Sequence, residues 1–477
     1  MIRSLLPIVG ALALTGCATV GPDYTSPAPG APGQSAFMGG ESPAFTGDEP
    51  PGHWWSLYDD PVLDGLVEEA LTYNTDLRVA AANLARSRAV LREVRSGRLP
   101  STTVSASATY SRPSGAINGL DEAMDEGEIY DVGLDVGYQL DLFGRIRRAV
   151  EASRADLEAV QAAFDFTRIT VAAETARAYA DACNAGRQLE VARRSVTLQE
   201  QTYDLTRRLL EGGRGTALET NQAGALLEQT RAAIPTLEAQ RQTALYRLSV
   251  LTGRPPAEFP QEVASCDTPP VITAAIPVGD GASLLSRRPD IRQAERELAA
   301  STARIGVATA ELYPDISLGG SIGATAAAIG DLFTGGAFRY ALGPLISWTF
   351  PNTSVARARI AQAEAEGDAA LARFDGTWLR ALEETESALT RYAKELDRVA
   401  TLRRARTQSA EAARIARLRF EAGRDPFQIV LDAERSLAET EAALAQSEAQ
   451  LSTNQIALFL ALGGGWEDRA AATVSRR

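Results

Sequence analysis

Residues 129–141 read IYDVGLDVGYQLD, and apolar and polar side chains alternate along this stretch. A two-residue hydrophobic period is typical of a β-strand, because successive side chains of a strand point to opposite faces of a sheet. The same alternation recurs in three other stretches. The sequence therefore predicts four strands of about ten residues each, at about residues 101–112, 129–142, 315–326 and 338–350.

Each predicted strand has one apolar face and one face of Ser, Gly, Asp and Thr. Such a strand suits a position between lipid and a water-filled lumen, although a soluble β-sandwich would show the same alternation. A sheet in lipid must have no free edge, and the smallest membrane barrels use about eight strands. A membrane interpretation therefore requires several chains to share one barrel.

Two stretches without proline predict unusually long helices, from residue 145 to about 211 and from 353 to about 421. At ~1.5 Å per residue, each helix would extend on the order of 100 Å. Apolar residues at coiled-coil spacing, such as Leu389, Tyr392 and Leu396, indicate that neighbouring helices pack along them. We expect each long helix to stop at a glycine-rich turn, from which a second helix returns as an αα-hairpin.

The chain consists of two copies of one plan. The block NTDLR at 74–78 aligns with RPDIR at 288–292, and LEGGR at 210–214 aligns with FEAGR at 420–424. Such an internal duplication predicts two structural repeats. The predicted boundaries are a lead-in at 17–52, a first repeat at 53–252, a proline-rich connector at 253–280, a second repeat at 281–463 and a C-terminal tail at 464–477.

The amino terminus has the layout of a secretory signal over residues 1–16, with a basic Arg3 followed by an apolar run. The run ends in Leu-Thr-Gly-Cys, which looks like a bacterial lipobox and predicts a lipid on Cys17; the alternative is an ordinary signal peptide with a chance cysteine. Position 18 is Ala rather than Asp, which favours the outer membrane. The other two cysteines, Cys183 and Cys266, are far apart and are expected to be separate thiols rather than a bridge.

Composition excludes several classes of function. The chain carries 61 acidic against 48 basic residues and a net charge of −13, which argues against a nucleic-acid partner. Three cysteines and one histidine, dispersed along the chain, do not make a zinc cluster, so no metal site is expected. The sequence has no recognisable set of nucleophile, base and orienting group, so we expect no enzyme activity and no cofactor beyond the lipid on Cys17.

Several blocks in this order resemble the TolC-like outer-membrane factors, and most closely their lipoprotein branch of the NodT and OprM type. The blocks are CATVGPDY from Cys17, YQLDLFGRIRRA at 138–149, LLSRRPDIRQAE at 284–295 and FEAGRDPFQIVLDAERSL at 420–437. The resemblance implies a mainly α-helical fold with a membrane β-barrel portion. Three chains would each give four strands to one 12-stranded barrel, continued by an α-helical tunnel across the periplasm.

The same resemblance implies a function and its partners. The protein would be the outer-membrane exit duct of a tripartite efflux or export system, joined to an inner-membrane transporter by a periplasmic adaptor. The alternative from the residues alone is a coiled-coil envelope lipoprotein scaffold without a pore. That alternative leaves the four lipid-suited strands without a purpose.

Candidate site residues also follow from the resemblance. The LDAERS block places a periplasmic gate at Asp432 and Arg435, although a solvated helix pair at i,i+3 is the simpler alternative. The position three before Asp432, which is acidic in some relatives, is Ile429, so a double acidic ring is not expected. The two hairpin tips are candidate adaptor contacts or plain turns; their residues are Gly213, Arg214, Gly423 and Arg424.

Overall fold

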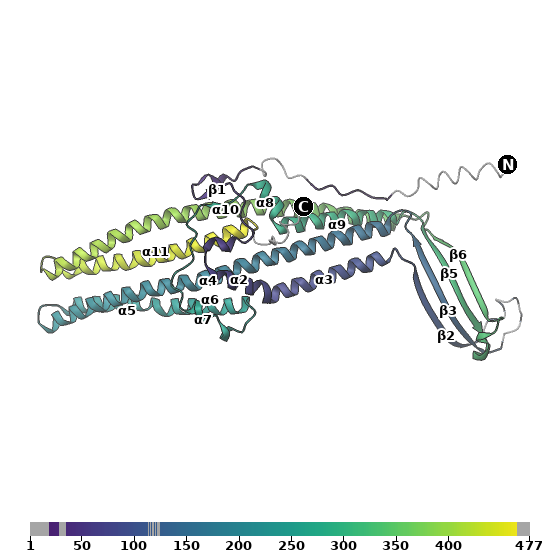
Figure 1. The fold of residues 1–477 in the computed structure, drawn as a ribbon, viewed down its shortest axis with the longest axis horizontal. Coiled ribbons are helices and arrows are strands. Elements are labelled where there is room, and N and C mark those ends of the chain that lie inside the picture. The colour runs from purple at the N-terminus through teal and green to yellow at the C-terminus, as the bar shows by residue number, and fades with distance from the viewer. Residues whose placement is uncertain are drawn as a thin grey trace. The chain divides into compact units, whose positions relative to one another are not determined.

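The computed structural model describes residues 19–27, 35–112, 114, 116, 119, 121 and 125–464. The predicted signal at 1–16, the predicted lipidation site Cys17 and the tail beyond residue 464 lie outside the described residues. The chain divides into two compact units. Among the described residues, the first comprises 19–27, 84–160 and 293–375, and the second comprises 35–83, 161–292 and 376–464, which can be followed by the residue colours of Figure 1.

The first unit contains a four-stranded antiparallel sheet in the order β2-β3-β5-β6. Its strands are β2 (Ser101–Ser111), β3 (Gly127–Leu140), β5 (Asp315–Ala326) and β6 (Phe338–Ser347), with the short turn η6 (Ile329–Phe333) between the last two. The final strand stops three residues before the predicted position 350. Its last partner is Asp315, and the preceding Pro314 has no N–H with which to extend the ladder.

Two very long helices leave the sheet region and continue into the second unit. These are α4 (Arg145–Glu211) with 67 residues and α10 (Ser354–Glu421) with 68. Two shorter helices, α3 (Thr75–Ser96) and α9 (Pro289–Ala310), likewise have residues in both units. Proline-free sequence allows such lengths, because no missing N–H interrupts the chain of backbone hydrogen bonds.

The return helix differs between the two copies. In the second copy it is the single helix α11 (Phe427–Ala461), whereas in the first it is divided into α5 (Ala217–Arg231) and α6 (Ala233–Leu251). Pro235 explains the break, because its ring nitrogen cannot donate to the carbonyl oxygen of Arg231 four residues earlier. The predicted return toward Leu251 in the first copy thus consists of two helices separated by Ala232 alone.

The main core of the second unit gathers short segments around the ends of the helices. Trp54 is fully buried and stacks on Phe459 with ring centroids 4.8 Å apart. The lead-in and the connector meet in a two-stranded parallel sheet of β1 (Phe45–Thr46) and β4 (Ile276–Pro277). The other elements here are η2 (Met38–Glu41), η3 (Trp54–Tyr58), α2 (Pro61–Tyr73), η5 (Pro256–Glu258), α7 (Gln261–Ala264) and α8 (Gly281–Arg287).

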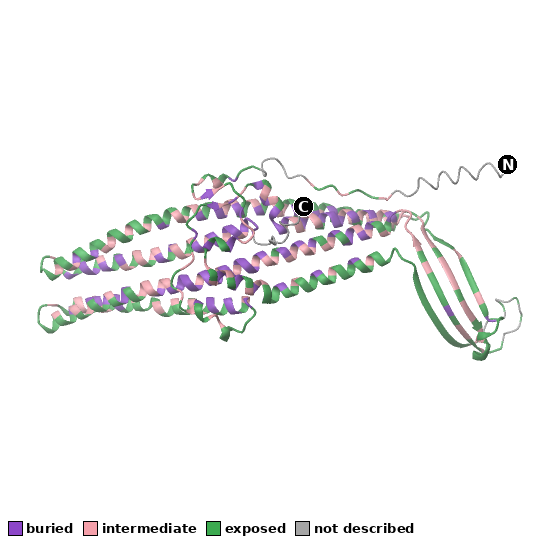
Figure 2. Cartoon of the chain, viewed as in Figure 1, coloured by how far each residue is buried: buried purple, intermediate pink, exposed green. Residues whose placement is uncertain are grey.

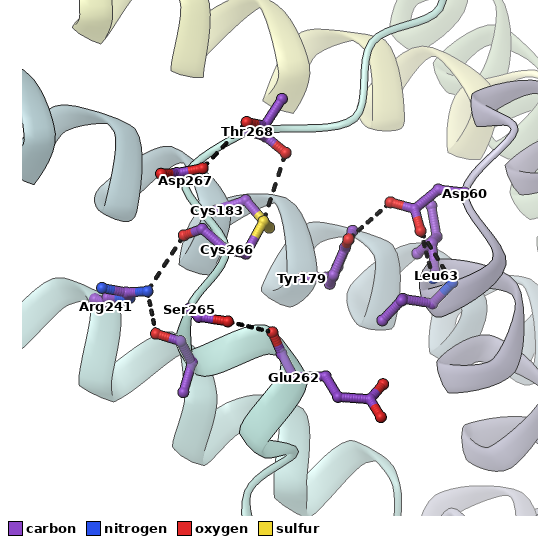
Figure 3. The surroundings of a disulfide bond; sticks show 12 residues. Asp60, Leu63, Tyr179, Cys183, Arg241, Glu262, Ser265, Cys266, Asp267 and Thr268 are labelled. Carbon is purple, nitrogen blue, oxygen red and sulfur yellow. Dashed lines mark hydrogen bonds between the residues drawn. A yellow bond between two sulfur atoms is a disulfide. The ribbon is translucent and has the colours of Figure 1, made fainter.

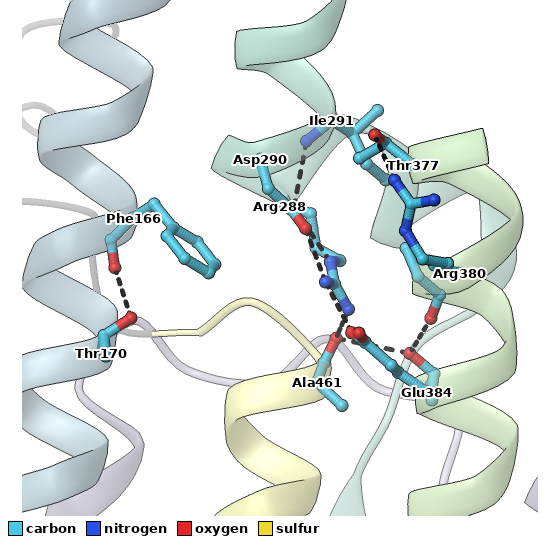
Figure 4. A network of polar contacts seen from close by, with 11 residues as sticks. Phe166, Thr170, Arg288, Asp290, Ile291, Thr377, Arg380, Glu384 and Ala461 are labelled. Atoms are coloured by element: carbon cyan, nitrogen blue, oxygen red, sulfur yellow. Dashed lines mark hydrogen bonds and ion pairs between the residues drawn. The ribbon is translucent and has the colours of Figure 1, made fainter. Parts of the chain in front are cut away.

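The two copies close the carboxyl ends of their return helices with side chains at equivalent positions. Asn74 Nδ2 donates to the carbonyl oxygen of Leu251 at 3.0 Å, and Arg288 donates to that of Ala461 at 3.0 Å. Arg288 also bridges to Asp290 at 2.6 Å and to Glu384 at 2.8 Å, so it joins α9, α10 and α11 (Figure 4). The RRPDI block thus holds three helices of the second unit together.

The two remaining cysteines form a disulfide, so the expectation of separate thiols is wrong. Cys183 on α4 and Cys266 in the connector have sulfur atoms 2.09 Å apart and are separated by 83 residues in sequence (Figure 3). Arg241 helps hold the connector here by donating to the carbonyl oxygen of Cys266 at 3.3 Å. Gly186 permits the close approach, because a Cβ on that residue would lie 2.1 Å from the same carbonyl oxygen.

Within the described residues, no helix is both long enough and apolar enough to span a membrane.

Candidate functional site

The sheet of the first unit has one face of small and polar residues. The strand registers pair Asp131 with Thr325, Gly133 with Gly323 and Asp135 with Ser321, so these side chains share one face. The facing residues of β2 are Ser and Thr throughout, because Ser105 pairs with Gly133 and Thr103 with Asp135. This face can border water along most of the strands, and its large apolar residues are Ile129 near the start of β3 and Leu345 near the end of β6.

The opposite face of the sheet is apolar and open. Figure 2 shows β2 and β6 as mostly exposed, and every residue of β2 up to Tyr110 is exposed. The large apolar side chains on this face have exposed fractions between 36% and 78%. They are Val104, Tyr110, Val132, Leu134, Val136, Tyr138, Leu318, Ile322, Phe338, Tyr340, Leu342 and Ile346. A continuous apolar surface of this kind requires an apolar environment, such as lipid.

Aromatic pairs mark the junction between the strands and the helices. Phe143 stacks on Tyr313 at 4.6 Å, and Trp348 stacks on Phe350 at 4.9 Å. The Trp348 indole donates to the carbonyl oxygen of Leu312 at 3.1 Å and is half exposed. Amphipathic rings are typical of the boundary between hydrocarbon and water.

The segment that follows the predicted lipidation site is fixed at this junction. Arg148, whose side chain is 4% exposed, donates to the carbonyl oxygens of Val20 and Gly21 and forms an ion pair with Asp23 at 2.7 Å. Burial together with the hydroxyl's hydrogen bond to Glu295 raises the pKa of Tyr24 to about 12. The chain is therefore held in place from Thr19, two residues after Cys17.

The two predicted hairpin tips have the same backbone geometry. Gly213 and Gly423 both have φ of +69°, a left-handed conformation that glycine adopts without a steric penalty. In each tip the next residue closes the turn, Arg214 N donating to Leu209 O at 2.8 Å and Arg424 N to Arg419 O at 2.9 Å. This pattern is the Schellman motif, which ends a helix with a satisfied last carbonyl.

The tips differ in their charged residues. In the second tip Arg419 makes two hydrogen bonds, of 2.6 and 3.0 Å, to Asp425, and these contacts lower the pKa of that carboxyl. Arg214 and Arg424 are exposed, and neither side chain has a hydrogen bond or ion pair with another described residue. These two guanidinium groups are thus open to an external partner.

The predicted gate residues lie together on the exposed face of α11. Arg435 and Asp432 have side chains 48% and 56% exposed and approach to 3.8 Å, while Gln428 donates to Asp432 at 3.0 Å. Ile429, on the same face, is 47% exposed. The buried residues Phe427, Val430 and Leu431 occupy the other face of the helix.

Sequence reasoning missed the buried carboxylate of Glu434, which lies between Asp432 and Arg435 in the chain. Glu434 is 1% exposed and accepts hydrogen bonds from Thr202 of α4, at 2.9 Å to each carboxylate oxygen, and an ion pair from Arg417 of α10. It therefore joins the two hairpins. The signal was present, because Glu434 follows Phe427 by seven residues and so falls on the apolar stripe of α11.

No group of three or more His, Cys, Asp or Glu side chains that could hold a metal ion is found in the part of the chain that the structure describes.

The comparisons with known proteins agree with this architecture. The family model described as "Outer membrane efflux protein" matches residues 66–254 and 282–464. The chain is 31% identical to outer membrane protein OprJ of Pseudomonas aeruginosa, covering 98% of this chain and 97% of that one. It is 29% identical to nodulation protein T of Rhizobium leguminosarum bv. trifolii, with 97% of both chains covered. The solved outer-membrane channel OprN superposes with a TM-score of 0.89 at 38% identity, over 94% of this chain and 100% of that one.

A sheet with one polar and one apolar face, in a chain that also forms two long helical hairpins, is typical of the outer-membrane duct class. The chain belongs to the outer membrane efflux protein family. It is an outer-membrane exit duct of tripartite efflux systems, of the NodT and OprM type, and not a scaffold without a pore. The family is one of channels rather than enzymes.

Proposed function

We propose that three copies of this chain close one barrel in the outer membrane and continue it as a helical tunnel. The observation that carries the proposal is the four-stranded sheet, whose edge strands β2 and β6 each pair on one side only among the described residues and whose apolar face is exposed. Open edges are not tolerated in hydrocarbon, so other copies must cover them. Three such sheets give 12 strands, above the roughly eight of the smallest membrane barrels.

The mass of the detergent-solubilised mature protein tests this stoichiometry. Light scattering corrected for bound detergent is expected to give three chains per particle. A particle of another stoichiometry would contradict the proposed closure, and a stable monomer would leave the sheet with two unpaired edges in lipid. The measurement requires no substitution, so a folding defect cannot explain its outcome.

The proposal extends to the anchor and the partners. A lipid on Cys17 would enter the membrane next to Thr19, whose hydroxyl accepts a hydrogen bond from Arg147 at the strand–helix junction, while Arg148 holds Val20. A periplasmic adaptor would contact the tips at Gly213, Arg214, Gly423 and Arg424, and would connect the duct to an inner-membrane transporter. The two exposed arginines favour an adaptor surface with acidic groups. No cofactor is required in this scheme.

The gate at Asp432 and Arg435 belongs to the same proposal. Three copies of α11 that meet around a common axis would bring six of these side chains close together, so that carboxylates and guanidinium groups of neighbouring chains pair and narrow the tunnel. Replacing both residues with alanine is expected to raise the single-channel conductance in planar bilayers severalfold, because the charged contacts across the axis are lost.

A matched pair on the neighbouring helix provides the control. Glu411 and Arg414 of α10 are also an exposed i,i+3 ion pair, at 2.6 Å. Their double replacement with alanine removes the same charges and should leave the conductance unchanged. An equal conductance for both double variants and the unsubstituted channel would show that Asp432 and Arg435 are only a solvated helix pair.

A further inference from the structure

The polar face of the sheet carries few charged side chains, and some of them have an ion-pair partner while another has none. Within the four described strands its ionisable residues are Asp131, Asp135, Asp315 and Arg339. Asp315 lies at the start of β5, where Gln139 hydrogen-bonds to it and Arg145 approaches to 4.0 Å. The other three lie farther along the strands and decide the charge of that part of the face.

Arg339 reaches Asp131 across the intervening strand. Arg339 is on β6 and Asp131 on β3, and β5 lies between them. Arg339 Nη2 nevertheless donates to Asp131 Oδ1 at 2.7 Å and Arg339 Nε donates to Oδ2 at 3.1 Å, while Thr325 of β5 donates to the same carboxylate at 2.6 Å. Asp131 is therefore neutralised by a two-point ion pair, the strongest geometry available to a carboxylate.

Two paired glycines lie beside this contact: Gly133 leaves space for the guanidinium group, and Gly323 permits the close approach of β3 and β5. Gly133 and Gly323 face one another in the register of β3 and β5. A Cβ at Gly133 would lie 3.2 Å from the Arg339 guanidinium, and a Cβ at Gly323 would lie 2.4 Å from the carbonyl oxygen of Val132. The arginine side chain thus crosses β5 where neither neighbouring residue has a side chain.

Asp135 has no such partner. It is exposed, four residues before Gln139 and four after Asp131 on β3, and its carboxylate makes no ion pair or side-chain hydrogen bond with any other described residue. At ~3.3 Å per residue, Asp131 and Asp135 are about 13 Å apart along the strand. This distance exceeds the Debye length of about 8 Å at physiological ionic strength. The charges at Asp131 and at Asp135 therefore act separately on an ion that passes along the wall.

We propose that Arg339 and Asp135 set the ion preference of the outer half of the duct. Arg339 cancels the charge of Asp131, and Asp135 leaves one uncompensated carboxylate per chain on the water-facing wall. This inference rests on the proposed barrel, in which each residue is repeated around the lumen. The duct then favours cations and cationic substrates where they pass Asp135. Substitution of Arg339 leaves the carboxylate of Asp131 without its counter-charge, which adds a second negatively charged position along the duct.

Reversal potentials in a KCl gradient across planar bilayers test the proposal. Replacing Asp135 with Asn is expected to lower the potassium-to-chloride permeability ratio by about 1.5- to 3-fold, and Arg339→Gln to raise it by a similar factor. Asp131→Asn leaves Arg339 unpaired and should lower the ratio. The combination of Asp131→Asn with Asp135→Asn should give an anion preference.

Two further variants separate charge from structure. Arg339→Lys keeps the positive charge but fits the Asp131 carboxylate less well. Its potassium-to-chloride permeability ratio should stay close to that of the unsubstituted channel. Asp48→Asn makes the same charge change at an exposed lead-in position outside the sheet and should have no effect. Conducting channels whose ratio is unchanged by Arg339→Gln and by Asp135→Asn would overturn the inference. Failure of the unsubstituted chain to conduct would instead count against the proposed barrel.

Discussion

Replacing Arg417 with Met is expected to destabilise the packing of the two hairpins near their tips by about 3 kcal/mol. Glu434 is 1% exposed, and its carboxylate is satisfied only by Thr202 and Arg417 among the described residues. Removing the cation leaves a buried charge without compensation, which generally costs about 3–5 kcal/mol. The lower end applies because the Arg417 side chain is itself 27% exposed, so water can partly replace it.

Hydrogen exchange of the α11 amides between residues 428 and 440 measures this loss locally. Exchange should be faster in Arg417→Met by about two orders of magnitude, since each 1.4 kcal/mol corresponds to a factor of about ten. Arg414→Met provides the matched control. It lies three residues earlier on α10, and among the described residues it pairs only with the exposed Glu411, so no change in exchange is expected.

A second substitution distinguishes lost charge compensation from lost packing. Adding Glu434→Gln to Arg417→Met removes the unpaired charge but keeps an oxygen that can accept from Thr202, so most of the protection should return. Unchanged exchange in Arg417→Met would contradict the assignment of Glu434 as a buried charge. Slow exchange restored only by an apolar residue at 434 would indicate that packing, not the ion pair, holds the hairpins together.

Loss of the Cys183–Cys266 disulfide is the second large effect. Replacing both cysteines with alanine is expected to lower stability by about 2–4 kcal/mol, because the bridge closes a long loop in the unfolded chain. The loop spans 83 residues and includes α5, α6 and α7. Thermal unfolding in detergent should shift to lower temperature, and the connector at 253–280 should become sensitive to protease.

Gly186 tests the same contact without touching a cysteine. An alanine here would place its Cβ 2.1 Å from the carbonyl oxygen of Cys266, so the connector must move away from α4. We expect a large fraction of Gly186→Ala chains to expose two alkylatable thiols without reductant. Gly65→Ala is the control, since a Cβ at Gly65 of α2 would contact nothing within 4 Å. Equal thiol counts in the two variants would show that the close approach is not needed for the bridge.

Several features of the fold could be predicted from the sequence because they obey local rules. A two-residue period specifies a strand wherever one face must be apolar, and proline and glycine limit a helix through sterics alone. The ends of α4 and α10 were predicted to within one residue on this basis. The break before α6 obeys the same rule, and Pro235 was its signal.

Other features depend on residues that the chain brings together from far apart. Glu434 and Thr202 are 232 residues apart, Arg339 and Asp131 are 208 apart, and Cys183 and Cys266 are 83 apart. Cysteine spacing alone does not tell a bridge from two thiols. Likewise an i,i+3 pair such as Asp432 and Arg435 can be identified from sequence, whereas its role depends on what neighbouring chains place opposite it.

The sequence by itself determined the hydrophobic period of the strands and the extent of the long helices, since these arise from backbone sterics and the spacing of apolar side chains within about one turn or two residues, and the repeated blocks determined the duplication. Only the tertiary structure decided which charges are compensated. Arg417 pairs with Glu434 and Arg339 with Asp131, while Asp135, Arg214 and Arg424 stay open to solvent. Whether a charge has a partner depends on distances between elements, and no local spacing in the chain specifies those distances.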